Sequence, residues 1–194
     1  MGPLCMRFCV PYFRSVTMKM NHIALAAVLL FTASVASAQA PGPTDPQIAA
    51  IVVTANQVDI DAGTLAKSKS TNKEVQDFAQ LMITDHTGVN KSATALVQKL
   101  HVTPEDNATS QGLKKGGDDN LAALKKLSGS AFDRAYVDHE VTYHQAVIDA
   151  VDSTLIPNAK NADLKALLIK VRPAFVAHLE HAKQLQSKLS KSGA

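Results

Sequence analysis

The chain has 194 residues, 46% of them hydrophobic, which is enough for one domain with a buried core. Its formal charge of +3 comes from Arg7, Arg14 and Lys19 in the first 38 residues, and the other basic residues balance the 17 acidic ones. A neutral domain gives no electrostatic reason to expect binding to nucleic acid or to an anionic membrane surface.

The first 38 residues have the pattern of a secretory signal peptide. An apolar run over residues 23–31 is too short to span a bilayer, and Ala36-Ser37-Ala38 is a signal-peptidase type site. We expect cleavage before Gln39 and export to the periplasm or the exterior. The natural signal is expected to begin near Met18, which would make residues 1–17 an N-terminal over-extension.

The two cysteines, Cys5 and Cys9, both precede the apolar run. The exported chain is therefore expected to have no thiol for a disulfide or for a metal site. Residues 39–44 form a tail that contains proline and glycine and leads into the domain.

Two helices are predicted in the first half of the domain. The first spans residues 45–68, with Thr44 or Asp45 as its cap and Pro46 in its first turn. The capping-box pattern Thr71-Asn72-Lys73-Glu74 opens the second, which continues to about residue 100. The short link makes the two helices antiparallel neighbours.

A long polar connection is predicted over residues 101–130. Pro104 and the glycines at 112, 116 and 117 interrupt it, and a short helix is expected over residues 118–127. A third helix follows, from about residue 130 to residue 155, where Pro157 and Asn158 end it.

A fourth helix is predicted over residues 161–190. It contains Pro173, which should bend it one turn before His178. Two helical hairpins joined by a long connection predict an all-α, ferritin-like four-helix bundle, with its crossover between the second and third helices. Residues 45–190 then form a single domain, which has no further apolar run long enough to cross a membrane.

Each predicted helix has an apolar stripe whose members are three and four residues apart, and one polar side chain interrupts each stripe. These four side chains are Asp59, His86, His144 and His178, at similar distances from the starts of their helices. A buried polar group needs a partner or a ligand, because an unpaired one costs a few kcal/mol. We therefore expect the four to converge near the middle of the bundle.

Imidazole and carboxylate groups together suit a divalent metal such as zinc, copper, nickel or iron. We predict His86, His144 and His178 as nitrogen ligands and Asp59 as an oxygen ligand. Glu140 lies one turn before His144 and would add a second carboxylate, either as a ligand or as a hydrogen-bonding partner. The alternative is that these carboxylates satisfy the histidines by hydrogen bonds without any metal.

Other polar residues near these positions are expected to stay outside the cluster. His181 could pair with His178 at a spacing of three residues, although it lies off the stripe. Asp85 and Tyr143 are expected to point elsewhere on their helices. His101 and His139 are expected to be solvated.

We do not predict an enzyme. Di-iron centres use inward glutamates and Glu-x-x-His pairs, and no such pair occurs in the sequence. The sequence also lacks a Gly-x-Ser-x-Gly elbow and a strand-linked phosphate loop. The leading hypothesis is binding or sequestration of a divalent metal, namely zinc, copper or iron, in the cell envelope. The alternatives are a structural or stress-related envelope protein with metal-free histidines and, with less support, a ferritin-like oxidase.

Three ordered motifs resemble a known family. They are FAQLMITDH at residues 78–86, SGSAFDRAY at residues 128–136, and Pro173 followed by His178-Leu179. They resemble signatures of the exported bacterial domain-of-unknown-function family 4142. His144 falls where that family has its next histidine, and Asp59 where it usually has glutamate. The resemblance covers residues 45–189 and implies an exported ferritin-like bundle without a settled activity.

Overall fold

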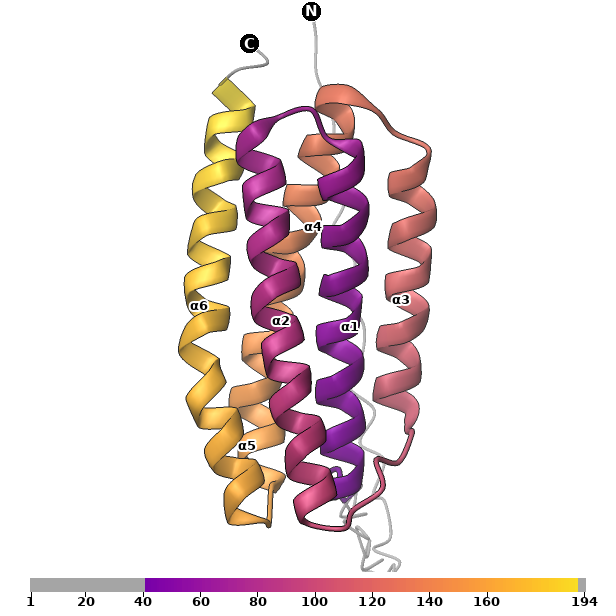
Figure 1. The fold of residues 1–194 in the computed structure, drawn as a ribbon, viewed down its shortest axis with the longest axis vertical. Coiled ribbons are helices and arrows are strands. Elements are labelled where there is room, and N and C mark those ends of the chain that lie inside the picture. Colours follow the sequence, from indigo (N-terminus) through magenta and orange to yellow (C-terminus); the bar gives the residue numbers. More distant parts are fainter. Residues whose placement is uncertain (1–40, 192–194) are drawn as a thin grey trace, which may run out of the picture. The chain divides into compact units, whose positions relative to one another are not determined.

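The structure is a computed structural model that describes residues 41–191, so the predicted signal peptide and residues 39–40 lie outside it. The regular secondary structure of its described part is all helical, and Figure 1 shows the helices side by side along one axis. In chain order they are α1 (Asp45–Lys69), α2 (Lys73–Lys99), α3 (Ala108–Lys125), α4 (Gly129–Ala150), the π-helical turn η1 (Val151–Leu155), α5 (Ile156–Asn158) and α6 (Ala162–Lys191).

Side-chain caps fix the starts of the first two helices. Thr44 caps α1 in a reciprocal box, since its hydroxyl accepts from the Gln47 backbone N–H and its own N–H donates to the Gln47 side chain at 3.1 Å. Asn72, and not the Thr71 box expected from the sequence, caps α2, and its Oδ1 accepts from the Glu74 N–H at 2.9 Å. The same Oδ1 of Asn72 also accepts from the Val75 N–H. One side-chain oxygen therefore satisfies two backbone donors of the first turn that have no partner within the helix.

Four long helices, α1, α2, α4 and α6, form the bundle that was predicted, and the all-helical fold with a long crossover is confirmed. In Figure 1 the chain runs up through α1, down through α2, up through α3, down through α4 and up through α6. Helices α2 and α4 therefore run in the same direction, because α3 carries the chain back along the length of the bundle.

The crossover itself is a correction, because it was expected to be mostly loop with a short helix. It contains the full helix α3, which packs mainly on α1, and the glycines at 112, 116 and 117 lie inside it. A Cβ on Gly117 would lie 2.7 Å from Cγ2 of Val58 on α1. The tertiary contact explains the glycine: close approach to α1 requires it, and packing outweighs its low helix propensity.

The third bundle helix also ends later in the chain than predicted. Helix α4 passes into η1, where one turn is widened, and the helical path reaches Asn158 instead of residue 155. Pro157 lies in that last short turn. Pro173 lies inside α6 as expected, and the bend it should cause stays a prediction.

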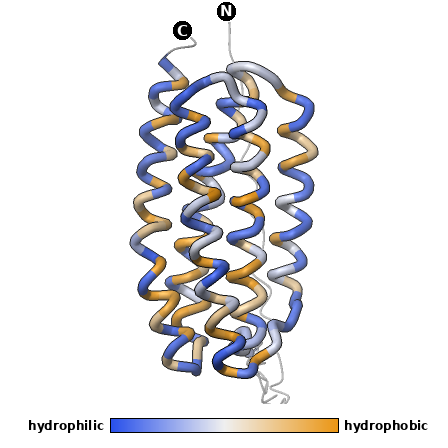
Figure 2. Tube along the Cα trace, in the orientation of Figure 1, coloured by the Kyte–Doolittle hydropathy of each residue, from blue (hydrophilic) through white to orange (hydrophobic). Residues whose placement is uncertain are grey.

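Two apolar clusters fill the bundle, one toward each end. One contains Phe78, Met82 and Tyr136, and the other contains Ile51, Leu168 and Phe175. On every long helix the residues predicted to form the polar cluster lie at the boundary between these two clusters. Figure 2 shows the corresponding alternation of hydrophobic and hydrophilic residues along the helices. None of the described helices is both long and apolar enough to cross a membrane.

Candidate metal centre

The structure brings all five predicted site residues into the middle of the bundle, and all are buried. Asp59 comes from α1, His86 from α2, Glu140 and His144 from α4, and His178 from α6. Their ligand atoms form two overlapping groups, in each of which the atoms lie within 4.8 Å of one another. One group is His86, His144 and His178, and the other is Asp59, Glu140 and His144.

Asn56 fixes the orientation of the His86 ring. The Asn56 Nδ2 donates to the backbone oxygen of Val52 at 2.8 Å, so its Oδ1 faces the ring and must accept. The Oδ1 lies 2.7 Å from Nδ1 of His86, which is therefore the protonated nitrogen. Nε2 of His86 is left with a lone pair that points into the bundle.

The other two histidines are held in the same manner by different oxygen acceptors. His144 Nδ1 donates to the backbone oxygen of Glu140, one turn earlier on α4, at 3.0 Å. His178 Nε2 lies 2.9 Å from the Asp85 carboxylate on α2. Carboxylates and carbonyls that hold the outer nitrogen in this way are typical partners of metal-binding histidines.

The inner nitrogen of each ring has no hydrogen-bond partner among the described residues. These atoms are Nε2 of His86, Nε2 of His144 and Nδ1 of His178. The ring centroids lie between 5.2 and 5.5 Å apart, so the three rings touch one another. Each of these three nitrogens can take a ligand, and leaving such an atom unsatisfied would cost about 1–3 kcal/mol.

Asp59 and Glu140 lie close to two of the histidines but form no ordinary hydrogen bond with them. Oδ2 of Asp59 lies 3.5 Å from Nε2 of His86, and Oε2 of Glu140 lies 3.4 Å from Nδ1 of His144. The first distance is too long for an ordinary hydrogen bond, and the second nitrogen already donates to a carbonyl. The metal-free alternative considered from the sequence stays a prediction, because the Asp85 carboxylate does hold His178 without any metal.

Burial controls the protonation of this cluster. It raises the pKa of Glu140 to about 8 and, with the nearby charge of Glu140, raises the pKa of Asp59 well above its ordinary value. Burial, followed by the charges of His144 and His178, lowers the pKa of His86 to about 2. The metal-free site thus keeps His86 neutral and resists the ionisation of its carboxyl groups, whereas a bound cation would reverse this resistance.

Two expectations about neighbouring residues were wrong. Asp85 was expected to point away, yet it holds His178. Tyr143 was also expected to point elsewhere, yet it lines a cavity together with Asp59 and His86, and its hydroxyl donates to the Ala55 oxygen at 3.1 Å. Both residues lie at the edge of the buried face. The apolar stripes used to predict burial do not show that long polar side chains at this edge reach the cluster.

The other histidines of the described residues lie outside the two groups of ligand atoms. His181 packs edge-on against Phe78 with the ring centroids 5.1 Å apart, and it belongs to neither group of ligand atoms. His139 is half-buried and stacks on Tyr143, in contrast to the solvated position expected for it. His101 is exposed, as expected.

Asn56 is the residue that the sequence analysis missed. The apolar stripe of α1 passes through Ala55 and Asp59, and Asn56 was not assigned to it. Its position three residues before Asp59, on the same helix face, is the signal that could have revealed it.

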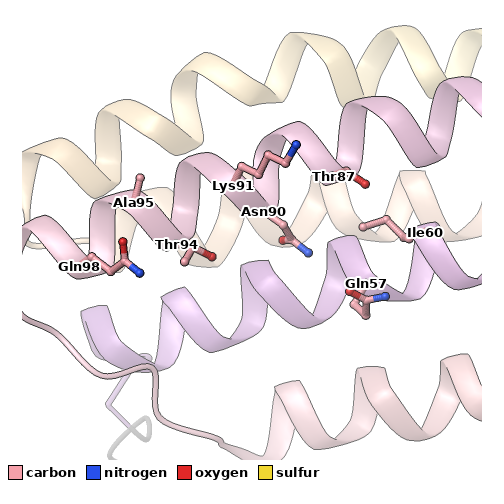
Figure 3. Close-up of a pocket in the computed structure, with 8 residues that line it drawn as sticks. All are labelled: Gln57, Ile60, Thr87, Asn90, Lys91, Thr94, Ala95 and Gln98. Carbon is pink, nitrogen blue, oxygen red and sulfur yellow. The ribbon is translucent and has the colours of Figure 1, made fainter.

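A separate groove on the outside of the bundle lacks the converging histidines and carboxylates of the buried cluster. It measures about 430 Å³, and its lining includes Gln57, Asn90, Lys91 and Gln98. Figure 3 shows these side chains spread along α1 and α2, without convergence on one point. The groove contains no histidine or carboxylate, so the buried cluster is the better candidate for chemistry.

Comparison with known proteins relates the chain to a family and to a solved structure. A family model described as "Domain of unknown function (DUF4142)" matches residues 31–185. No curated protein matches the chain significantly. A solved structure titled "CopM in the Cu(II)-bound form" has a similar fold, with a TM-score of 0.58 and 18% identity. That similarity covers 76% of this chain and 98% of the CopM chain.

Proposed function

We propose that this chain, which belongs to the DUF4142 family, binds one divalent transition metal inside its helical bundle. His86, His144 and His178 would supply the nitrogen ligands, and Asp59 and Glu140 would supply carboxylate oxygen. The observation that carries the proposal is the hydrogen bonding of the three histidine rings. Each has one nitrogen held by an oxygen acceptor and an inner nitrogen with no partner in the described part of the chain.

A metal ion suits this arrangement better than a hydrogen-bonded core does. One cation can accept three lone pairs together, and none of the three has a hydrogen-bond partner among the described residues. A positive charge would also stabilise the ionised forms of Asp59 and Glu140, which burial otherwise opposes.

The donor set narrows the choice of metal. Imidazole suits copper, zinc and iron, and no cysteine occurs in the described part of the chain. Copper binds most tightly among the first-row divalent ions at a given nitrogen and oxygen site. The Cu(II)-bound form of CopM, whose fold is similar, supports copper as the first ion to test, with zinc second and iron third.

The physiological role that we propose is binding or sequestration of the metal after export, without catalysis. The signal-like leader supports export, although it lies outside the described residues. A ferritin-like oxidase is less well supported, because the cluster offers two carboxylates and no Glu-x-x-His pair. A structural or stress-related envelope protein is the remaining alternative.

The test is a metal titration of chelator-treated protein purified without a histidine tag. A ligand that binds only the folded state stabilises it by about 2.7 kcal/mol at a hundredfold excess over Kd, which should raise the Tm by several degrees. Copper or zinc should produce this shift. His86→Ala and His178→Ala should abolish it.

The matched control is His101→Asn. His101 is exposed and has a positive φ of 53°, a conformation that asparagine tolerates well. This variant should keep the full metal response. If no divalent ion shifts the melt, while His86→Ala costs several kcal/mol in the metal-free protein, the histidines are structural and the proposal fails.

A further inference from the structure

The candidate metal centre is closed off from solvent. The inner nitrogens of the three histidines, Nε2 of His86, Nε2 of His144 and Nδ1 of His178, are all buried atoms. An ion that arrives from solvent cannot reach these atoms unless some part of the bundle moves. The part that moves would then set the rates at which the ion enters and leaves.

The cluster lies at a seam between α1 and α4 that is incompletely packed. Helix α1 packs mainly on α2 and α3, and α4 packs mainly on α6, so α1 and α4 contact each other little. Asp59 on α1 nevertheless has its ligand atom within 4.8 Å of those of Glu140 and His144 on α4. A cavity of about 320 Å³ lies in this seam, and its lining includes Asp59 and His86.

Helix α3 covers this seam from the outside of the bundle. Thr109 and Leu113 of α3 line the cavity together with Tyr143 of α4. Figure 1 shows α3 on the outer side of the bundle beside α1. Beneath α3 the Tyr143 hydroxyl crosses the seam and donates to the Ala55 oxygen at 3.1 Å. Movement of the first half of α3 would therefore remove one wall of the cavity and leave Tyr143 as the cover over Asp59.

The first half of α3 is weakly held. In the two apolar clusters of the described residues, the buried member from α3 is Leu124, which lies near the other end of this helix. Leu113 is only half-buried. A Cβ on Gly112 or Gly116 would meet no atom within 4 Å, so packing does not require either glycine, and each makes the helix less stable than alanine would. Few buried apolar contacts and low helix propensity are typical of segments that open locally.

We infer that residues 108–116 form a gate for the metal ion, and that this part of α3 opens locally to admit the ion to the cluster through the seam between α1 and α4. Gly117, where a Cβ would lie 2.7 Å from Val58, marks the point beyond which α3 stays packed on α1. The inference rests on the proposed metal function. The gate is closed in both the free and the loaded protein, so it controls the rates of uptake and release and leaves the Kd unchanged.

The test is stopped-flow measurement of Cu(II) uptake by the chelator-treated protein and of Cu(II) release to a chelating dye. Gly112→Ala and Gly116→Ala stabilise the closed gate, and each should slow both steps about fivefold because the open population falls by that factor. Leu113→Ala removes a half-buried side chain that holds the gate shut and should speed both steps about fivefold. The Kd should stay the same in all three variants.

The matched control is Gly88→Ala on α2. A Cβ on Gly88 also meets no atom within 4 Å, so this variant gains the same helix propensity outside the gate. It should change neither rate. Equal slowing by Gly88→Ala and Gly116→Ala would show that the ion enters by opening of the whole fold, and unchanged rates in both α3 variants would show that α3 does not open. Either result would overturn the inference.

A second measurement reports the gate without any metal. Diethyl pyrocarbonate modifies accessible imidazole nitrogens, so its reaction with His86, followed by mass spectrometry with the exposed His101 as internal reference, measures access to the cluster. Gly116→Ala should slow this reaction about fivefold, and Gly88→Ala should not. If no ion binds while the reaction of His86 still responds to the α3 variants, the metal function fails and the opening of α3 is confirmed. A reaction that ignores these variants overturns the gate.

Discussion

The side chain of Asn56 on α1 holds His86 on α2 in one tautomer, through a contact of 2.7 Å between Oδ1 and Nδ1. This single contact decides which nitrogen of His86 faces the cluster. It acts on the ligand and not on the metal, so Asn56 is a positioning residue.

Replacement of Asn56 should therefore weaken metal binding without removing a ligand. Asn56→Ala frees the ring of His86 and is expected to reduce affinity by about 10-fold to 100-fold, as measured by competition with a chelator. Asn90→Ala is the matched control, because Asn90 donates only to the Val53 oxygen in the outer groove. Equal affinities of the two variants would show that Asn56 does not position the ligand.

The two groups of ligand atoms should hold one ion between them, not one each. Both groups use His144, whose Nδ1 already donates to the Glu140 oxygen and which therefore has a single free lone pair. Native mass spectrometry of the copper-loaded protein should show one bound ion per chain. A second ion that is lost on His144→Ala would contradict this sharing.

The metal-free protein should lose stability as the pH rises from 6.5 to 8. Burial raises the folded-state pKa of Glu140 from 4.5 to about 8, so in this window the folded protein holds a proton that the unfolded chain has released. The raised pKa of Asp59 acts in the same direction. For the Glu140 carboxyl group the slope should approach about 1.4 kcal/mol per pH unit.

The lowered pKa of His86 changes stability with pH in the opposite direction, and it does so at lower pH. Its folded-state pKa is lowered from 6.5 to about 2, so its contribution is present above pH 6.5 and is lost as the pH falls below that value. Urea unfolding of the chelator-treated protein at pH 6.5 and pH 8 measures the difference. Glu140→Gln should flatten the dependence, and a stability that increases toward pH 8 would contradict the assignment.

The glycines of α3 should respond in opposite ways to alanine. Gly117→Ala places a Cβ 2.7 Å from the stiff, buried Val58 and should destabilise the fold by about 1–3 kcal/mol. Gly116→Ala meets no atom within 4 Å and should stabilise it by up to about 1 kcal/mol through helix propensity. Chemical unfolding of both variants tests the packing of α3 on α1, and similar effects would show that this contact does not form.

Processing of the leader is testable on its own. The apolar run and the Ala36-Ser37-Ala38 site predict that N-terminal sequencing of exported protein begins at Gln39, or within a residue or two of it. Recovery of the exported protein with Met1 or Met18 intact would contradict the proposed export by a cleaved signal.

The sequence alone determined the helical bundle and the residues at its centre. Each long helix has an apolar stripe with a period near 3.6, so the position of a residue on its helix face follows from counting, and a polar residue on that face must be buried. Asp59, His86, His144 and His178 were found in this way. Glu140 was found because it lies one turn before His144.

Only the tertiary structure decided which atoms meet. Asn56 and Asp85 act on histidines of other helices, and Tyr143 reaches α1 across the bundle. No local pattern records contacts between residues that are 30 or 93 positions apart in the chain. The full length of helix α3 was also missed for this reason. Its glycines indicate a loop in the sequence, and only the close approach of Gly117 to Val58 shows that a glycine is needed there for packing. Helix periodicity fixes the face of a residue, whereas the height and rotation of neighbouring helices, which the packing of the whole core sets, fix its partner.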